Sequence, residues 1–348
     1  MRRSRWRDPR IWLGIAITAV TLWLALRGID LAVLARDLSR ADLPLVIGLS
    51  VPSYVLLLWL RALRWRHLTN AIAPLPLGSL YRATAVGFLA NNVFPLRLGE
   101  LVRAWALARD QHLGVAPVVG TIVLERVIDG IVVVVLAMVI FGVRGSRSGD
   151  TLAVGIPLLF GALLPLGAVL LMRFRPEGAA RLARSAARWV LPTRAGVSLE
   201  DIIRRMSEGL GSLHGGRHLW WVVLHSALIW AVLGVVPFLA GFAALGIDFG
   251  SARRALAASY VVLTAVGIAV ALPSAPGFFG PYHLAAREAL SRFGVADEAA
   301  LALGTLSHAL MWITTSALGL LVLRGRTPQL EELAEAAAAE RDPAAPDP

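Results

Sequence analysis

The sequence predicts an all-α, polytopic integral membrane protein with about six full spanning helices and two broken re-entrant helical hairpins, arranged as inverted repeats. The first observation is composition: of 348 residues, 57% are hydrophobic and 16% are charged, and the mean hydropathy is +0.68. Soluble domains are less apolar and more highly charged. The second is a series of apolar segments that approach the roughly 20 residues a spanning helix needs. The third is a pair of apolar segments that run into polar sequence rich in proline and glycine.

Six apolar segments are predicted to cross the membrane as helices. The first is predicted to be a retained helix and not a secretory signal peptide, because no small-residue cleavage site follows it. The six segments are residues 11–26, 43–60, 115–141, 152–172, 218–245 and 299–323.

The distribution of arginine orients these segments. Residues 1–10 hold five arginines, residues 173–217 hold nine, and the tail after 323 holds three. By the positive-inside rule these three regions are cytoplasmic, so both termini face the cytoplasm of a bacterial-type inner membrane. The net charge of +11 then reflects cytoplasmic loops beside an anionic lipid surface, and it does not indicate nucleic-acid binding.

Two segments cannot cross the membrane fully if the other helices keep this orientation. Residues 77–112 must begin and end in the cytoplasm, which predicts a re-entrant hairpin that turns at "NNVFPLRLGE". Residues 251–293 must begin and end outside and turn at "PSAPGFFGPYH". The alternative is a plain helix followed by an interfacial helix in each case. The predicted hairpin-breaking residues are Pro95, Gly99, Pro273, Pro276, Gly277, Gly280 and Pro281.

This threading divides the chain into two membrane halves. Residues 1–172 and 218–325 each contain a helix, a broken hairpin and a helix, and the two hairpins enter from opposite faces, as in inverted-repeat transporters. Residues 173–217 form a basic cytoplasmic linker, predicted to be an amphipathic helix on the inner leaflet or else a solvated loop. The tail, residues 326–348, is predicted to be cytoplasmic and partly disordered.

Polar residues in the first half are the main candidates for a binding site. Six charges facing lipid would cost about 15–20 kcal/mol at roughly 2.5–3.5 kcal/mol each, so they must face one another or a wet cavity. Arginine forks and free backbone N–H groups suit an anionic headgroup, with the glutamates as counter-charges. The alternative is a structural ion-pair lock between Arg97 or Arg103 and Glu125. The candidates are Asn91, Asn92, Arg97, Glu100, Arg103, Glu125, Arg126 and Asp129.

The second half adds His283, Arg287 and His308 as candidate substrate-binding residues. Two histidines suggest a proton-responsive pair, with hydrogen-bonded structural residues as the alternative, whereas a metal site is not expected. The chain contains no cysteine, and all 34 basic residues are arginine. Thiolate metal sites, Schiff-base chemistry and a P-loop are therefore excluded, and no cofactor is expected.

Three motifs carry a resemblance to a known family. "NNVFPLRLGELVRAWAL", "ERVIDG" and "PSAPGFFG", with "LRALRWRHL" after the second helix, resemble the flippase-like membrane domain of the lysylphosphatidylglycerol synthase/flippase family. In bifunctional members of the family, a synthase domain follows this membrane region. The resemblance covers the membrane region only, so it implies the translocating half without the synthase. Many relatives have a glutamate shortly after the Pro-Gly-Gly run, whereas this chain has His283 in that region. If that glutamate binds a cationic headgroup in relatives, its replacement here favours an anionic or sugar-bearing lipid over an aminoacyl lipid.

The leading functional hypothesis is a lipid flippase or scramblase that moves an anionic or modified headgroup, on a phospholipid or a polyprenyl phosphate, through a polar cavity. A secondary transporter of a small solute or ion is the alternative, followed by a membrane enzyme acting on lipid-linked substrates. The chain has no Asp-Asp pair for a Mg²⁺-diphosphate site and no G-x-S-x-G element, so we do not expect an enzyme. Nothing in the sequence specifies an oligomeric state.

Overall fold

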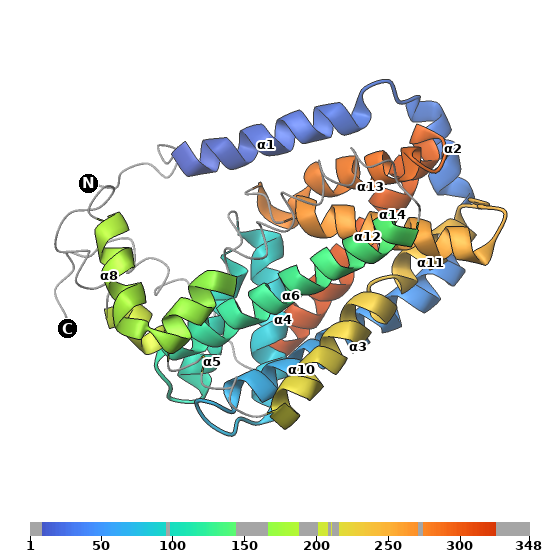
Figure 1. Cartoon of the computed structure of the whole chain (residues 1–348). Helices are drawn as coiled ribbons and strands as arrows, with labels where there is room; N and C mark the ends of the chain where they lie inside the picture. The colour runs from blue at the N-terminus through green and yellow to red at the C-terminus, as the bar shows by residue number, and fades with distance from the viewer. Residues whose placement is uncertain are drawn as a thin grey trace.

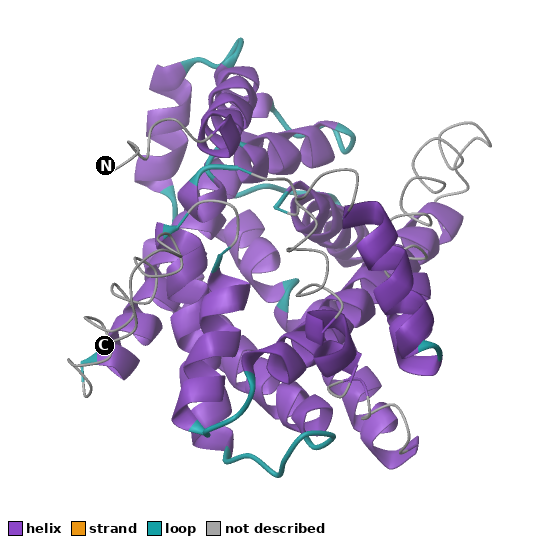
Figure 2. Cartoon of the chain, turned by 90° about the vertical axis from the view of Figure 1, so that its left-hand side faces the viewer, coloured by secondary structure: helices purple, strands orange, loops and turns teal. Residues whose placement is uncertain are grey.

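The protein folds as an assembly of α-helices, as the sequence predicts. The computed structural model describes residues 9–94, 98–143, 166–187, 201–207, 210, 216–270 and 274–324. Within these ranges every regular element is helical, and Figure 2 shows helices joined by short loops without a strand. An all-helical chain of this apolarity satisfies its backbone hydrogen bonds within each segment, which is what a lipid environment requires.

Four helical segments are long and apolar enough to cross a membrane: α3 (Leu43–Thr69), Trp220–Ala244, α12 (Ala252–Ala269) and α14 (Asp297–Leu323). The second of these joins α10 (Gly216–Ala227), the π-helical turn η4 (Leu228–Leu233) and α11 (Val236–Ala244). Three of the four match predicted spans. The fourth, α12, was predicted as one arm of a re-entrant hairpin, so its length also fits the plain-helix alternative.

The first predicted span, residues 11–26, is helical, and a second helix follows it at a sharp angle. Helix α1 (Pro9–Leu26) is followed by α2 (Leu31–Arg40) at an angle of 86°, and the two qualify as a membrane span only as a pair. Asp30 starts α2, because its carboxylate accepts hydrogen bonds from the backbone N–H groups of Ala32 and Val33. The described residues thus offer four or five candidate spans, against about six predicted.

Helix α6 (Val115–Val143) agrees in extent with the predicted span 115–141 and carries its charged residues in its interior. The predicted span 152–172 lies mostly outside the described residues; its last part, 166–172, is helical. The linker contains α8 (Pro176–Ala187) and a helical segment at 201–207. The latter lies against α6, since a Cβ on Gly120 would come within 2.1 Å of the Met206 carbonyl oxygen. The predicted tail, 326–348, lies outside the described residues.

The first hairpin consists of α4 (Leu77–Val93) and α5 (Gly99–Asp110), which pack along each other. Gly99 allows this approach, because a Cβ there would lie 2.1 Å from the Gly87 carbonyl oxygen. The backbone N–H of Gly99 donates to Asn91 Oδ1 at 2.9 Å, which closes the start of α5 onto the end of α4. Pro95 and Arg97, in the turn between them, lie outside the described residues.

The second hairpin pairs α12 with α13 (Pro281–Ser291) through the short 3₁₀ turn η5 (Pro276–Phe278). Gly277 and Gly280 adopt φ of +75° and +89°, a region that residues with a Cβ rarely occupy. A Cβ on Gly280 would also lie 2.4 Å from Thr21 Oγ1. Figure 1 shows α1 passing beside α13. Pro273 lies outside the described residues.

Each half has its own apolar core. One cluster of buried side chains comes mainly from α3, α4, α5 and α6, including Trp65 and Leu107. The other comes from α11, α12, α13 and α14, including Phe242 and Leu303. Because α14 packs on both α3 and α4, and α10 packs on α3, the two halves interlock (Figure 1).

Candidate functional site

A cluster of buried charged side chains lies where α3, α5 and α6 meet. Arg64 of α3 is at its centre and is fully buried. Its Nη2 donates to Glu125 Oε1 at 2.9 Å, and its Nη1 donates to Asp129 Oδ1 at 2.6 Å. Arg61, one turn earlier on the same helix, places Nη1 3.4 Å from Asp129 Oδ2 and 3.5 Å from Glu125 Oε1. Two adjacent turns of α3 therefore bring two guanidinium groups to the two acids of α6.

Helix α5 adds a third arginine. Arg103 Nη1 donates to Glu125 Oε1 at 3.2 Å and lies 3.0 Å from Oε2. Its guanidinium lies over the Trp65 ring, 3.7 Å from the centroid, so an aromatic face covers the cation. Trp65 is itself fixed, because its Nε1 donates to Thr121 Oγ1 at 2.9 Å.

The cluster reaches the surface at one end. Arg126 Nη2 lies 2.8 Å from Glu125 Oε1, and its Nη1 lies 3.7 Å from Glu100 Oε1. The side chains of Arg126 and Glu100 are 34% and 24% exposed, whereas that of Glu125 is inaccessible. A charged group could approach the buried arginines from this end.

The second half closes the cluster from the other side. Ser226 of α10 accepts from Arg64 Nη1 at 2.9 Å, and Trp230 of η4 donates its Nε1–H to Asp129 Oδ1 at 2.9 Å. The cluster therefore lies between the two halves of the chain. We call it the charge network; its members are Arg61, Arg64, Glu100, Arg103, Glu125, Arg126 and Asp129.

The charge network is richer in cations than in anions. Four arginines face three carboxylates, so it carries one excess positive charge. Arg103 Nη2, the Nε atoms of all four arginines and one acceptor, Glu125 Oε2, are buried without a hydrogen-bond partner among the described residues. A buried N–H without an acceptor costs about 1–3 kcal/mol, more when the group is charged. An anion bound here would supply both the missing charge and the missing acceptors.

A known protein family matches most of this chain. The model of the lysylphosphatidylglycerol synthase transmembrane region matches residues 11–319. The chain belongs to this family. The comparisons with curated proteins and with solved structures gave no match.

The sequence predicts five of the seven members of the charge network as site residues. It did not select Arg61 and Arg64, although "LRALRWRHL" was part of the resemblance. Their spacing of three residues at the end of an apolar helix indicates one face, but only the fold places that face against α6. The alternative prediction is an ion-pair lock between Arg97 or Arg103 and Glu125. The Arg103–Glu125 pair is present, whereas Arg97 lies outside the described residues.

The two candidate asparagines make internal contacts. Asn91 holds Gly99 across the hairpin. The Asn92 Nδ2 donates to Thr315 Oγ1 at 3.0 Å and Ser316 Oγ at 2.9 Å, which ties the end of α4 to α14. In this structure both side chains hold helices in place.

The candidates of the second half lie around η5 and α13. His308 Nε2 lies 2.7 Å from the Gly277 carbonyl oxygen and so donates to it, and the His283 ring lies edge-on to that of His308 at 5.0 Å. Both histidines are buried, and His283 Nδ1 has no hydrogen-bond partner among the described residues. Arg287 instead donates to the carbonyl oxygens of Leu24 and Ala25, at the end of α1.

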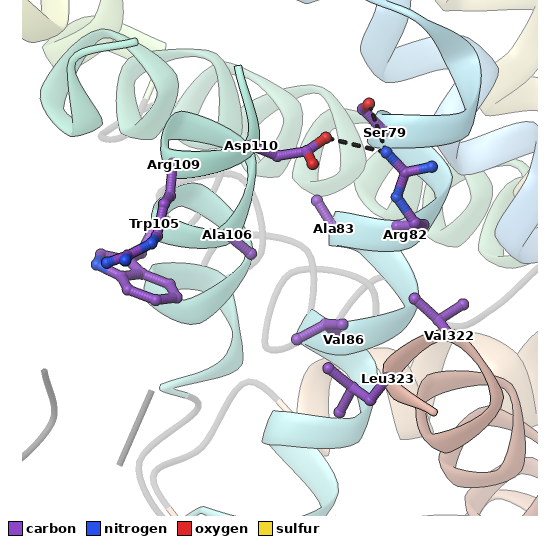
Figure 3. A pocket seen from close by; sticks show the side chains of 10 residues that line it. All are labelled: Ser79, Arg82, Ala83, Val86, Trp105, Ala106, Arg109, Asp110, Val322 and Leu323. Carbon is purple, nitrogen blue, oxygen red and sulfur yellow. Dashed lines mark hydrogen bonds and ion pairs between the residues drawn. The ribbon is translucent and has the colours of Figure 1, made fainter. Parts of the chain in front are cut away.

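A separate pocket lies at the other end of the first hairpin, next to the end of α14 (Figure 3). Arg82 of α4 donates from Nη2 to Asp110 Oδ2 at 3.0 Å and to Ser79 Oγ at 2.9 Å. On the opposite wall of the pocket, Arg109 of α5 lies over Trp105 of the same helix, with its guanidinium carbon 5.4 Å from the ring centroid. The hairpin thus carries arginine at both ends, at the charge network and at this pocket.

Among the described residues, no group of three or more histidine, aspartate or glutamate side chains is arranged to hold an ion. The carboxylates of the charge network are occupied by arginine instead.

Proposed function

We propose that this protein translocates lipids with an anionic or modified headgroup, on a phospholipid or a polyprenyl phosphate, across a bacterial-type inner membrane. The observation that carries the proposal is the excess positive charge of the charge network, with its unpaired guanidinium N–H groups. Membership of a family named for lysylphosphatidylglycerol synthesis supports a lipid substrate. Both termini would face the cytoplasm, and the protein would act by translocation and not by catalysis.

The network offers a physical reason for moving a phosphate through apolar surroundings. A bare anion in a low-dielectric interior loses several kcal/mol of solvation that only close cations restore. Guanidinium forks bind phosphate in a bidentate manner, so a headgroup can exchange for Glu100 or Glu125 on the arginines without leaving a cation unpaired. Glu100 is the better placed for exchange, because its contact to Arg126 is long, at 3.7 Å, and partly exposed.

The position between the halves supports a transport step. Ser226 and Trp230 belong to the second half, whereas the arginines belong to the first. A movement of the halves against each other would change the acceptors around Arg64 and the donors around Asp129. Such a change would alter the affinity for an anion, as alternating access requires.

The test is lipid translocation in proteoliposomes. Fluorescent phosphatidylglycerol, its lysyl form and a polyprenyl-phosphate sugar are compared by loss of inner-leaflet protection. Wild type should accelerate at least one anionic lipid, and Arg126→Ala should abolish the acceleration. Arg204→Ala is the matched control, because Arg204 belongs to an exposed ion pair with Glu177 in the linker region.

The result that would overturn the proposal is no acceleration of any of these lipids by folded protein. Uptake of a soluble organic anion by the same vesicles would then favour a secondary transporter. Equal loss of activity in Arg126→Ala and Arg204→Ala would remove the charge network from the mechanism.

A further inference from the structure

Two histidines from different halves face each other where α3 ends and α10 begins. His67 lies in the last turn of α3, and His218 in the first turn of α10. Their Nδ1 atoms are 3.3 Å apart, and the ring centroids are 5.6 Å apart with a tilt of 50°. Both side chains are half-buried.

The separation of the two nitrogens has a specific meaning. Two metal–nitrogen bonds of about 2.05 Å that meet at a tetrahedral angle place their nitrogens about 3.3 Å apart. A direct imidazole–imidazole hydrogen bond is the competing explanation; its usual length is about 2.9–3.0 Å, and it requires one Nδ1 to carry a proton. The observed 3.3 Å is long for such a bond and matches the edge of a tetrahedral site.

We propose that His67 and His218 form a divalent transition-metal site, of the zinc or nickel class, that clamps α3 to α10. Both imidazoles would bind through Nδ1 in their neutral form, and water would complete the coordination. Imidazole nitrogen is the ligand these ions prefer in the absence of thiolate, and the chain has no cysteine to compete for them. The proposal needs only two protein ligands, consistent with the absence of a larger cluster among the described residues.

Neighbouring groups fix the geometry of the pair. The His67 ring stacks on Trp221, with 6° between the planes and 6.1 Å between the centroids. His225 Nδ1 donates to the Trp221 carbonyl oxygen at 2.6 Å, and its ring lies 5.5 Å from that of His67. His67 is thus held between residues of α10, which limits the entropy it would lose on binding an ion.

The position gives the site a consequence for the charge network. His67 follows Arg64 by one turn on α3, and His218 precedes Ser226 by two turns on α10. Arg64 and Ser226 are joined by a hydrogen bond of 2.9 Å. A bound ion would therefore hold together the two helices that meet at the network. If the proposed translocation requires these helices to separate, the ion would slow it.

The experiment measures metal binding without any transport assay. Tag-free full-length protein in nanodiscs is titrated with Zn²⁺ by calorimetry, and with Co²⁺ by visible absorption. We expect one ion per chain and a rise in the unfolding temperature with Zn²⁺. His67→Ala and His218→Ala should each lose both effects, and His112→Ala, at a loop between α5 and α6, should retain them.

Two outcomes overturn the proposal. Folded wild type that binds no Zn²⁺ or Co²⁺ would leave a simple imidazole–imidazole contact. Binding that survives in His67→Ala would place the ion elsewhere. Either result is independent of lipid translocation, so the metal site and the proposed function fail separately.

Discussion

Replacing Glu125 with glutamine tests whether the charge network is a buried, interdependent ion cluster. Glu125 is inaccessible to solvent and lies within 3.5 Å of guanidinium nitrogens of Arg61, Arg64, Arg103 and Arg126. The glutamine keeps the size of the side chain but removes its charge and turns one acceptor into a donor. The excess positive charge of the network rises from one to two.

The magnitude follows from this burial. Removing one partner of a buried ion pair costs about 3–5 kcal/mol, because the remaining charge is left without compensation. A folded domain is stable by about 5–15 kcal/mol, so the loss is a large fraction of the total. Glu177→Gln is the matched control. Its ion pair with Arg204 has side chains 64% and 56% exposed, and exposed pairs contribute about 0–1 kcal/mol.

The assay is reversible denaturant unfolding in mixed micelles, followed by the fluorescence of the 11 tryptophans. Glu125→Gln should lower the midpoint strongly, and Glu177→Gln should barely change it. Adding Arg103→Met to Glu125→Gln should recover part of the loss, because the second change removes one uncompensated cation. Equal midpoints for the two single variants would refute a tightly paired network.

Two further predictions concern the packing around the network. Gly99→Ala should destabilise the fold by about 2 kcal/mol or more through overpacking of the first hairpin. The control Gly130→Ala should be neutral or stabilising, because a Cβ there would meet nothing within 4 Å. Equal unfolding midpoints for the two variants would contradict the close approach of α4 and α5. Trp65→Phe should cost about 1–3 kcal/mol, because the buried Thr121 hydroxyl loses its donor while Arg103 keeps an aromatic face. The control Trp59→Phe, at a position 44% exposed, should change the unfolding midpoint little. Equal midpoints for Trp65→Phe and Trp59→Phe would argue against the Trp65–Thr121 hydrogen bond.

The sequence alone determined the all-helical membrane class and the positions of most helices. Apolar length and composition are local properties, and they predicted α3, α6 and α14 to within a turn or two at most ends. The cost of buried charge also predicted that the charged residues would face one another or a wet cavity, and Glu125 and Asp129 do face arginines. The motifs correctly indicated the family, because motif order is read directly from the chain.

Only the tertiary structure decided which charges meet. Arg64 and Glu125 are separated by 61 positions in sequence, and Arg64 and Ser226 by 162, so neither contact leaves a periodic pattern in the sequence. The same holds for Asn92, whose amide ties α4 to α14, and for His67 and His218, 151 positions apart. Helix formation depends on neighbours within a turn, whereas these contacts depend on how whole helices pack. The local chemistry therefore predicted that buried charges need partners, and the packing of the two halves selected them.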